Sequence, residues 1–469
     1  MTDEPGPGFR TPDTEYRDYE LRIEGTVPSW LSGTLLRNGP GLFEVGEERV
    51  NHWFDGLAML RRYAFEDGAV RYANRFLRTD AYENATSGRR TGGFATGARG
   101  WRRLLAWLRA LGPPDPADNT SVHVARIDGE YVALTEAPKR VVFDPETLET
   151  CGPFTFADDL TEHVATAHYV DDPHRGELVG YATQFGRRSQ YHVYRVPDGE
   201  RSRRRIASIR ARGPGYIHDC SVTDDHVVLV EPPLSVSLWR ALAPTTEGFL
   251  DLLSWQPERG TRIVVLDRDG GDVRQDVTVE SMFTFHHVNA YHDDGTVVLD
   301  IVDFPDADIV DAMALDALGG SGGFPDVPDG RLARYRIDLT TGVVTREQPY
   351  AGGVELPRVP RAVRGRRHRY AYAQTTDREG ANGIAKIDCE EGSATEWSEQ
   401  SVYVEEPVPV QHPDGDAEDD GVVLATAVDV EDERSALLIF DAATLEERAR
   451  AILPHAEPFG FHGRYFPDL

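Results

Sequence analysis

Histidine supplies the side chains best suited to chemistry in this 469-residue chain, which contains 15 of them. Two are adjacent, His286 and His287, within the run Phe283–Tyr291, whose aromatic and β-branched residues are typical of a strand. Neighbours on a strand point to opposite faces, so one of the two can face an interior metal while the other faces its own sheet. Because imidazole is the commonest metal ligand in proteins, the pair indicates a metal site if other parts of the chain supply further ligands.

Three more histidines follow small or apolar residues, as an inward-facing strand end would. They are His168 after Ala165-Thr-Ala, His218 after Gly215-Tyr-Ile, and His462 after Pro458-Phe-Gly-Phe. Their wide separation along the chain places them and His286 in different strands, which could meet only at a central axis. The other histidines share no such pattern, and we interpret most of them as surface or hydrogen-bonded core residues: His123, His174, His192, His226, His368, His412 and His455.

The elements that must position these histidines are predicted to be short strands. Apolar runs such as Tyr131–Thr135, His226–Val230 and Thr296–Asp300 alternate with stretches of Gly, Pro and Asp. Many short strands at nearly even spacing predict an all-β sandwich or propeller. At roughly 40–50 residues per four-stranded blade, the length suits six to eight blades. Asp-Gly pairs are hairpin signals, and examples of them begin at Asp128, Asp269, Asp294, Asp329 and Asp420.

We expect one catalytic propeller domain over residues 21–469, after a polar and irregular segment at residues 1–20. The acidic loop His412–Asp420 is interpreted as a solvated insertion. Two segments break the β pattern and predict helical insertions, near residues 98–112 and near residues 234–255. Each of them is rich in leucine and tryptophan.

The first of these predicted helices has an apolar face and a basic face. Two interpretations stay open. Both helices can pack on the propeller, or the apolar face can be a lip that dips into a bilayer and collects a lipophilic substrate. The residues of that apolar face are Trp101, Leu104, Leu105, Leu108 and Leu111.

The charge of the chain is strongly negative, at −29 from 79 acidic and 50 basic residues. Of the basic residues, only Lys139 and Lys386 are lysines. This composition predicts a halophilic source, such as a haloarchaeon, because molar salt screens like-charge repulsion; a GC-rich genome also favours arginine over lysine. Duplex nucleic acid is excluded as a partner, since binding phosphates needs a basic face.

The cellular location is predicted from cysteines and from apolar segments. Cys151, Cys220 and Cys389 are widely spaced and form no C-x-x-C pair, which is typical of a reducing compartment. The acidic start of the chain lacks the pattern of a signal peptide, and no apolar run reaches the roughly 18 residues of a membrane span. We expect a cytoplasmic protein, with peripheral contact to the inner face of the cell membrane as the second interpretation above.

A series of ordered blocks from about Val27 to Pro467 resembles the carotenoid cleavage oxygenase family. That family includes apocarotenoid oxygenases, β-carotene oxygenases, stilbene-cleaving dioxygenases and the retinal pigment epithelium isomerase. Because so many blocks occur in order, the match is highly specific, although each block alone would be weak. The blocks are Gly33–Gly41, His52–Met59, Asn74–Thr79, Asp144–Thr150, Ile217–Asp219, Phe285–Ala290, Glu355–Arg358 and Gly460–Gly463.

The resemblance implies a seven-bladed β-propeller with a helical dome over an axial iron site. One Fe(2+) per subunit would be held by His168, His218, His286 and His462. Three glutamates would accept the outer N–H groups of these ligands: Glu136 from His218, Glu355 from His286 and Glu406 from His462. The implied reaction inserts both atoms of O2 across one C=C bond and gives two carbonyl products. Its implied role is carotene catabolism.

Departures from the family pattern bear on the substrate. Stilbene-cleaving members tend to carry Lys before the first of these glutamates, and this chain has Thr135 there, so we prefer a carotenoid. The family often has Glu where this chain has His292. Other hypotheses are stilbene cleavage, a retinoid isomerohydrolase on the same scaffold, and a non-catalytic propeller that binds carotenoids or proteins. No obligate protein partner is inferred.

Overall fold

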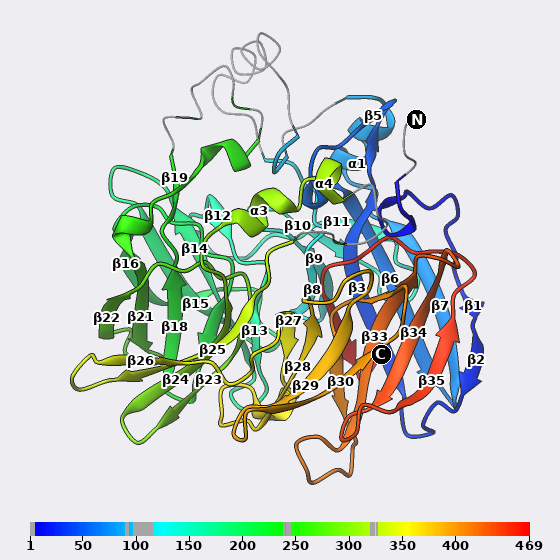
Figure 1. Ribbon diagram of the computed structural model, residues 1–469. Helices are drawn as coiled ribbons and strands as arrows, with labels where there is room; N and C mark the ends of the chain where they lie inside the picture. Colours follow the sequence, from blue (N-terminus) through cyan, green and yellow to red (C-terminus); the bar gives the residue numbers. More distant parts are fainter. Residues whose placement is uncertain are drawn as a thin grey trace.

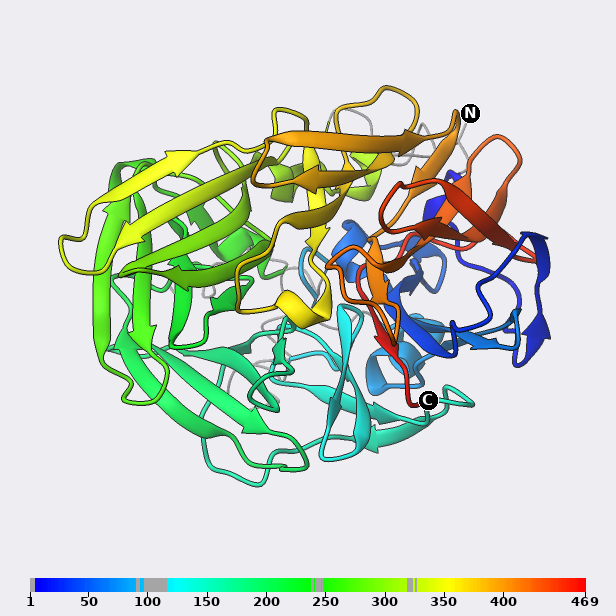
Figure 2. The ribbon, with the colours of Figure 1, turned by 90° about the horizontal axis from the view of Figure 1, so that it is seen from below.

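Seven antiparallel sheets, arranged as blades around a common axis, make up most of the regular structure in the computed structural model (Figure 2). The structure describes residues 5–89, 93–96, 116–237, 240, 246, 248–318, 324 and 327–469. The predicted all-β propeller is confirmed. Its number of blades in the described residues is the seven that the family resemblance implies.

The first four blades follow the chain from its N-terminal part. The first has the order β1 (Tyr19–Glu20), β7 (Ala69–Phe76), β6 (Leu57–Glu66), β3 (Gly33–Leu42), β36 (Gly463–Phe466). The second has the order β11 (Thr150–Pro153), β10 (Arg140–Phe143), β9 (Glu130–Leu134), β8 (His123–Ile127). The third has the order β12 (Val164–Ala165), β14 (Glu177–Gln184), β15 (Gln190–Pro197), β16 (Arg204–Arg210), with β13 (Val170–Asp172) also on β14. The fourth has the order β17 (Cys220–Val222), β18 (His226–Glu231), β21 (Thr261–Asp267), β22 (Val273–Val279).

The remaining three blades complete the ring. The fifth has the order β23 (His287–Asp293), β24 (Thr296–Asp303), β25 (Arg331–Asp338), β26 (Val344–Glu347). The sixth has the order β27 (Val354–Arg358), β28 (Tyr370–Thr375), β29 (Gly383–Asp388), β30 (Ser393–Ser398). The seventh has the order β2 (Arg22–Gly25), β35 (Glu447–Ile452), β34 (Arg434–Asp441), β33 (Gly421–Asp429), β31 (Val402–Val404), with β32 (Val408–Gln411) also on β33.

The two ends of the chain close the ring. β2, near the N-terminus, pairs with β35, while β36, near the C-terminus, pairs with β3. One edge strand of each of these blades contacts an edge strand of another blade: β17 contacts β23, β23 contacts β27, and β36 contacts β8. These strands therefore surround the axis, and residues at their ends can meet there.

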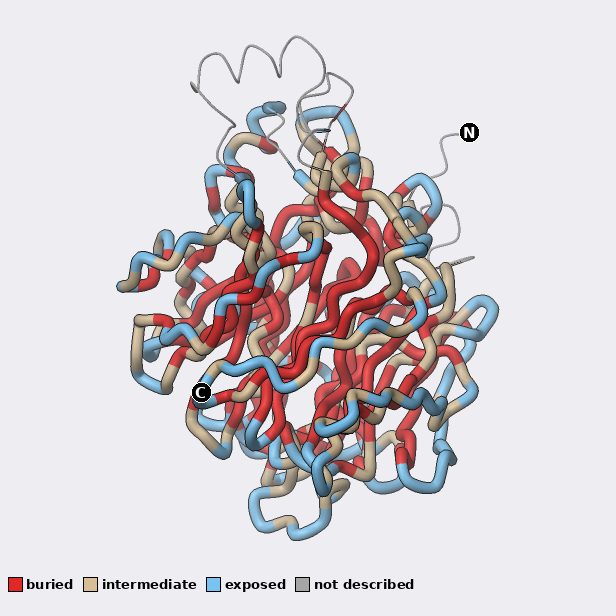
Figure 3. The backbone as a smooth tube through the Cα atoms, turned by 90° about the vertical axis from the view of Figure 1, so that its left-hand side faces the viewer, coloured by how far each residue is buried: buried red, intermediate tan, exposed pale blue. Residues whose placement is uncertain are grey.

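Apolar residues hold neighbouring blades together. Val228 and Ile263 of the fourth blade, for example, share a buried cluster with Leu299 and Ala333 of the fifth. Buried residues run along the blades, whereas exposed ones gather in the loops (Figure 3). Burying such apolar faces is the main favourable term in folding, so the packing between blades fixes the positions of the axial strands.

Two of the five predicted Asp-Gly turns are tight hairpins in which both residues have positive φ. Asp128-Gly129 joins β8 to β9, and Asp294-Gly295 joins β23 to β24. Asp269 and Gly270 lie in a longer turn between β21 and β22. The pair at Asp329 instead precedes β25, and the pair at Asp420 spans the start of β33, whose first residue is Gly421.

Short helices and small hairpins cover one end of the ring (Figure 1). They form the dome that the resemblance implies, at the upper end of Figure 1. The helices are α1 (Asp80–Thr86), α3 (Asp308–Ala312) and α4 (Leu315–Leu318), and the hairpins are β4 (Glu44–Val45) with β5 (Glu48–Arg49) and β19 (Leu234–Val236) with β20 (Leu253–Trp255). Single 3-10 turns are η1 (Pro7–Phe9), η2 (Trp53–Asp55), η4 (Leu250–Leu252), η5 (Pro257–Arg259) and η6 (Arg361–Val363).

The predicted helix near residues 234–255 is wrong for the described part of that segment. Its two ends form the hairpin β19–β20, and the helical residues described between them belong to 3-10 turns, at residue 240 and in η4. Leu234, Val236 and Leu253 of this hairpin are buried in the apolar core, and periodicity alone cannot separate such a short apolar run from a helix. The predicted helix near 98–112, with Trp101, Leu104, Leu105, Leu108 and Leu111, lies outside the described residues. No described helix is long and apolar enough to span a bilayer.

The segment predicted to be polar and irregular is integrated into the fold over its described residues, 5–20. Phe9 is fully buried in the largest apolar cluster, against Trp53 and Phe459. β1 adds to the edge of the first blade through Tyr19 and Glu20. The burial of Phe9 and the pairing of β1, which the mean polarity of the segment does not reveal, anchor this part of the chain.

Candidate metal centre

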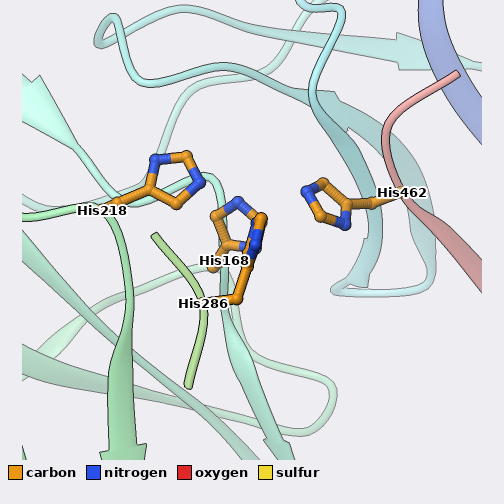
Figure 4. A group of neighbouring side chains, drawn as sticks. All are labelled: His168, His218, His286 and His462. Carbon is orange, nitrogen blue, oxygen red and sulfur yellow. The ribbon is translucent and has the colours of Figure 1, made fainter. Parts of the chain in front are cut away.

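The four predicted histidines meet on the propeller axis (Figure 4). His218, His286 and His462 lie just before β17, β23 and β36, and His168 lies between β12 and β13. One ring nitrogen from each lies within 4.8 Å of those of the other three, a group that could hold a metal ion. Ring centroids are 4.4 Å apart for His168–His218 and His168–His462, and 4.9 Å apart for His286–His462.

The inner nitrogens of this cluster are left without protein partners. Among the described residues, the buried Nε2 atoms of His168 and His286 meet no hydrogen-bond partner. Buried polar atoms are nearly always satisfied in folded proteins. Two unpartnered imidazole nitrogens that face two further imidazoles therefore fit the ligand set of a bound cation.

Three glutamates bind the outer nitrogens of three of these histidines, in the predicted pairs. His218 Nδ1 is 2.7 Å from Glu136 Oε1, His286 Nδ1 is 2.6 Å from Glu355 Oε2, and His462 Nδ1 is 2.8 Å from Glu406 Oε1. A carboxylate that accepts the Nδ1–H leaves the lone pair on Nε2, which faces inward. In the part of the chain that the structure describes, no carboxylate bonds to the ring of His168.

Burial and charge set the protonation of the cluster. Burial and the neighbouring imidazoles lower the pKa of His168 well below its usual value, and burial lowers the pKa of His462 to about 4 although Glu406 opposes it. Both rings are therefore neutral at pH 7, the form that binds metals. Burial would also lower the pKa of His286, but Glu355 outweighs it and raises that pKa. A carboxylate that favours positive charge at this ring also favours a cation beside it.

A β-bulge directs Glu355 toward His286. The register between β27 and β28 shifts between Glu355 and Arg358, and Leu356 within this bulge has a φ of 49°. Positive φ is unusual for a leucine and is retained where the surroundings impose it. Here the Leu356 N–H donates to the Glu355 carboxylate, so the bulge holds the glutamate at its histidine.

A close approach of two backbones places His462. A Cβ built on Gly39 would lie 2.4 Å from the Cα of Gly460, so only glycine fits there. The neighbouring Asn38 donates through Nδ2 to the carbonyls of Thr120 and His123 at 2.7 and 3.1 Å. The Gly33–Gly41 block therefore aligns the last loop of the chain with the axis.

A cavity of about 810 Å³ opens beside the histidines, toward the dome. His218, His286 and His462 line it, and so do Thr135 and Glu136. Most of its wall is apolar and aromatic. The aromatic residues of the wall include Trp53, Phe54, Phe94, Phe185, Tyr216, Phe249, Phe285, Phe324, Tyr403, Phe459 and Phe461.

Three residues next to the cluster were missed from the sequence. Tyr216 donates to Glu136 Oε2 at 2.8 Å, and Arg358 donates to Glu406 Oε1 at 2.7 Å. The signal for Tyr216 is its place two residues before His218, because alternate residues of an extended chain point to the same side, and Arg358 ends the Glu355–Arg358 block. His123 was interpreted as uninvolved, but its buried ring lies 5.3 Å from that of His462.

Other histidines lie away from the centre. His287 points away from the cluster, as the alternation of an extended chain predicts, but it bonds to Ser221 Oγ of β17 in the neighbouring fourth blade, at 2.8 Å, rather than to its own sheet. His292 is exposed and pairs with Asp225 at 3.4 Å. Asp300, His368 and Cys389 form a second group with ligand atoms close together, but Arg334 donates to both oxygens of Asp300 at 2.8 and 2.7 Å. This buried ion pair already occupies the carboxylate that a cation would need.

Comparison with known proteins extends over nearly the whole chain. The family model described as "Retinal pigment epithelial membrane protein" matches residues 9–467. Carotenoid cleavage dioxygenase 8 of Arabidopsis thaliana is 31% identical over 96% of this chain and 83% of its own length. The carotenoid isomerooxygenase of Galleria mellonella is 32% identical over 96% and 93%, and the β,β-carotene 15,15′-dioxygenase of Mus musculus is 29% identical over 96% and 89%.

Solved structures agree with these relatives. Cobalt-substituted Synechocystis ACO superposes with a TM-score of 0.87 at 26% identity, covering 98% of each chain. A mutant of Synechocystis apocarotenoid oxygenase gives a TM-score of 0.87 at 27% identity over 98% of each chain. With a family match over almost its full length and the same propeller, this chain belongs to the retinal pigment epithelial membrane protein family, that is, the carotenoid cleavage oxygenases.

Proposed function

We propose that this protein is a non-haem Fe(II) dioxygenase that cleaves a C=C bond of a carotenoid or apocarotenoid with O2 to give two carbonyl products, aldehydes or ketones. The observation that carries the proposal is the convergence of four imidazoles beside a large aromatic cavity. Several relatives similar over nearly the whole chain are named for such a reaction.

His168, His218, His286 and His462 would hold one Fe(2+) per chain. Imidazole suits iron, and four neutral ligands leave coordination positions open and the charge of the cation uncancelled. When bound there, iron supplies the activation of O2. Glu136, Glu355 and Glu406 keep three of the rings in the tautomer and orientation that ligation needs, since each accepts an Nδ1–H.

The wall of the large cavity would bind the substrate and exclude water. An aromatic wall gains free energy by burying a lipophilic polyene, and a dry cavity protects reactive species from side reactions. Thr135, where stilbene-cleaving members tend to have lysine, lines this cavity and supports a carotenoid over a phenolic stilbene. A cytoplasmic location and peripheral membrane contact through the Trp101–Leu111 face stay predictions.

The test is turnover by the iron-loaded protein. All-trans β-carotene and a shorter apocarotenal are supplied in detergent micelles under ¹⁸O2, and O2 uptake and product masses are measured. We expect two carbonyl products, each with one labelled oxygen, and loss of both in His286→Ala but not in His287→Gln.

Other outcomes favour the other hypotheses. Conversion of a retinyl ester without O2 uptake would identify an isomerohydrolase, and cleavage of a hydroxylated stilbene alone would identify a stilbene oxygenase. Iron content near zero after anaerobic reconstitution, with carotenoid still bound, would identify a non-catalytic propeller.

A further inference from the structure

A second, much smaller cavity of about 20 Å³ lies next to the histidine cluster. Ala167 and Gly463, the chain neighbours of His168 and His462, line it, together with the ring of His123. Among the described residues, it shares no lining residue with the large cavity. Its volume exceeds the roughly 10–15 Å³ that a single water-sized occupant requires. One small molecule or ion therefore fits.

This cavity lies toward the end of the ring opposite the dome. η6 lies near the middle of the ring in the view from below (Figure 2). Arg364, the residue that follows η6, lines the cavity. The side chains of Arg358, Arg364 and Arg464 are 19%, 22% and 21% exposed, so the arginines of the cavity are mostly buried and each retains some contact with solvent.

The lining is cationic. Arg358, Arg364 and Arg464 contribute guanidinium groups, and Asp171 is the one carboxylate among its described lining residues. The lining thus carries more basic than acidic residues, whereas the whole chain has a net charge of −29. Burial lowers the pKa of His123 well below its usual value, with Arg358 adding to the effect, so this ring brings no charge of its own at pH 7.

Asp171 has to serve three guanidinium groups. Its Oδ2 lies 2.6 Å from Arg361 Nε, 2.8 Å from Arg464 Nη2 and 3.6 Å from Arg364 Nη1. The last distance is too long for a hydrogen bond. In the described residues, no hydrogen bond joins the Arg364 guanidinium to an acceptor. The adjacent carboxylate of Asp172 does not neutralise Arg364, because it pairs with Arg268 at 2.5 Å.

The fourth guanidinium is balanced. Arg358 is 2.7 Å from Glu406, which in turn accepts from His462. Arg361 lies outside the lining of the cavity and also interacts with Asp198. Among the lining residues, Arg364 and Arg464 therefore share Asp171, which leaves an excess of one positive charge at the cavity. Burial lowers the pKa of Arg364 to about 10, with Arg358, Arg464 and Arg361 acting in the same direction against Asp171. The positive charge of Arg364 is thus destabilised by its surroundings, and an added negative charge would stabilise it.

We propose that this axial cavity binds one small monovalent anion of the size of chloride, held by the guanidinium groups of Arg364, Arg464 and Arg358. Charge selects an anion, and the volume excludes organic anions. Because Arg358 also binds Glu406, the anion reduces the positive potential next to the Glu406–His462 pair. The site is separate from the substrate cavity and from the metal ligands themselves.

The first experiment locates the ion directly. Crystals of the iron-loaded protein are grown in chloride, soaked in sodium bromide and measured at the bromine absorption edge. We expect one anomalous peak in the cavity, within about 3.5 Å of guanidinium nitrogens, as for a charge-assisted contact to a large anion. Its absence in wild-type crystals that show bromide elsewhere would overturn the proposal.

The second experiment needs neither crystals nor turnover. The midpoint of thermal unfolding, Tm, of the iron-loaded protein is measured in sodium chloride and in sodium gluconate at equal ionic strength. A ligand that binds only the folded state raises Tm with its concentration, so wild type should unfold at a higher temperature in chloride, and Arg364→Gln should lose this difference. Arg366→Gln, an exposed arginine that pairs with Asp224, is the matched control and should keep it.

Comparing variants cancels the general effects of each salt on stability, because these act equally on wild type and both variants. If Arg364→Gln fails to fold, Arg364→Lys, which keeps the charge, should fold and retain a reduced difference between chloride and gluconate. Equal differences in wild type, Arg364→Gln and Arg366→Gln would overturn the proposal. Neither experiment depends on the substrate or on the dioxygenase reaction.

Discussion

The two cavities next to the histidine cluster differ in size and in chemistry. The one toward the dome has a volume of about 810 Å³ and an aromatic wall, while the one toward η6 has a volume of about 20 Å³ and an arginine wall. Residues of the dome, such as Phe54 and Ile309, build much of the first, whereas strand ends near the axis build the second. Under the two proposals, the propeller would separate the binding of an apolar substrate from the control of charge around the proposed metal ligands.

The largest expected effect tests the centre that lies between the two cavities. His286→Ala removes one of four proposed ligands and leaves Glu355 without its partner. Because loss of an outer partner alone typically costs about 10–100-fold in metal affinity or activity, loss of the ligand should cost more than about 100-fold in turnover. Iron content by mass spectrometry and O2 uptake check this result. The adjacent His287→Gln should retain iron; if it lost iron while His286→Ala kept it, the assignment would be reversed.

The next effect concerns the outer partners. Glu355→Gln keeps the shape of the side chain but removes the charge that raises the pKa of His286. We expect a fall of about 10–100-fold in iron affinity or turnover. Titration with Fe(II) under anaerobic conditions measures the affinity. Glu347→Gln, an exposed glutamate on β26, is the control and should leave it unchanged.

Asp171→Asn changes the arginine-lined cavity and leaves the aromatic one untouched. Its effect on stability should depend on pH. Burial alone would raise the pKa of Asp171, but Arg464, Arg361 and Arg364 hold it at about 2. A carboxyl whose pKa is lower in the folded than in the unfolded protein stabilises the fold at pH values above its ordinary pKa. This stabilisation is lost as the pH falls toward 2. The substitution should therefore reduce the free energy of unfolding by about 2 kcal/mol at pH 7, and by less at pH 3.

Urea unfolding at the two pH values measures this difference. The same variant removes a negative charge from the cationic cavity, so its Tm should depend more strongly on chloride than that of wild type. A cost that stays constant between pH 7 and pH 3 would contradict the ionised state of Asp171.

The smallest effect belongs to the aromatic cavity. Phe249 is half-buried in its wall, 6.0 Å from Tyr216 and 6.1 Å from Phe94 between ring centroids. Phe249→Ala removes apolar contact area worth about 1.5–3 kcal/mol when fully buried, so we expect kcat/KM for a carotenoid to fall about tenfold. Iron content and the response to chloride should not change. Tyr19→Ala, which removes an exposed ring on the edge strand β1, is the control. An equal fall in its kcat/KM would argue against a specific contact between Phe249 and the substrate.

The strands and the four histidines could be predicted from the sequence. Two wrong predictions, for the segment near residues 234–255 and for the start of the chain, show why other features could not. The alternation of His286 and His287 depends only on the local geometry of an extended chain, and the structure directs His286 to the histidine cluster and His287 to Ser221. The segment near residues 234–255 was assigned to a helix because a short apolar run has no unique period. The polar start of the chain was thought irregular, yet burial of Phe9 ties it to the core.

By itself, the sequence determined the fold class, the candidate metal ligands and the glutamates that pair with them, because each depends on local pattern or on motifs that match a family. Only the tertiary structure decided that His123, Tyr216 and Arg358 adjoin the centre, and that three arginines share Asp171 near the axis. The physical reason is that burial and electrostatic interactions depend on distances in space. Ring closure sets these distances among residues that are far apart along the chain.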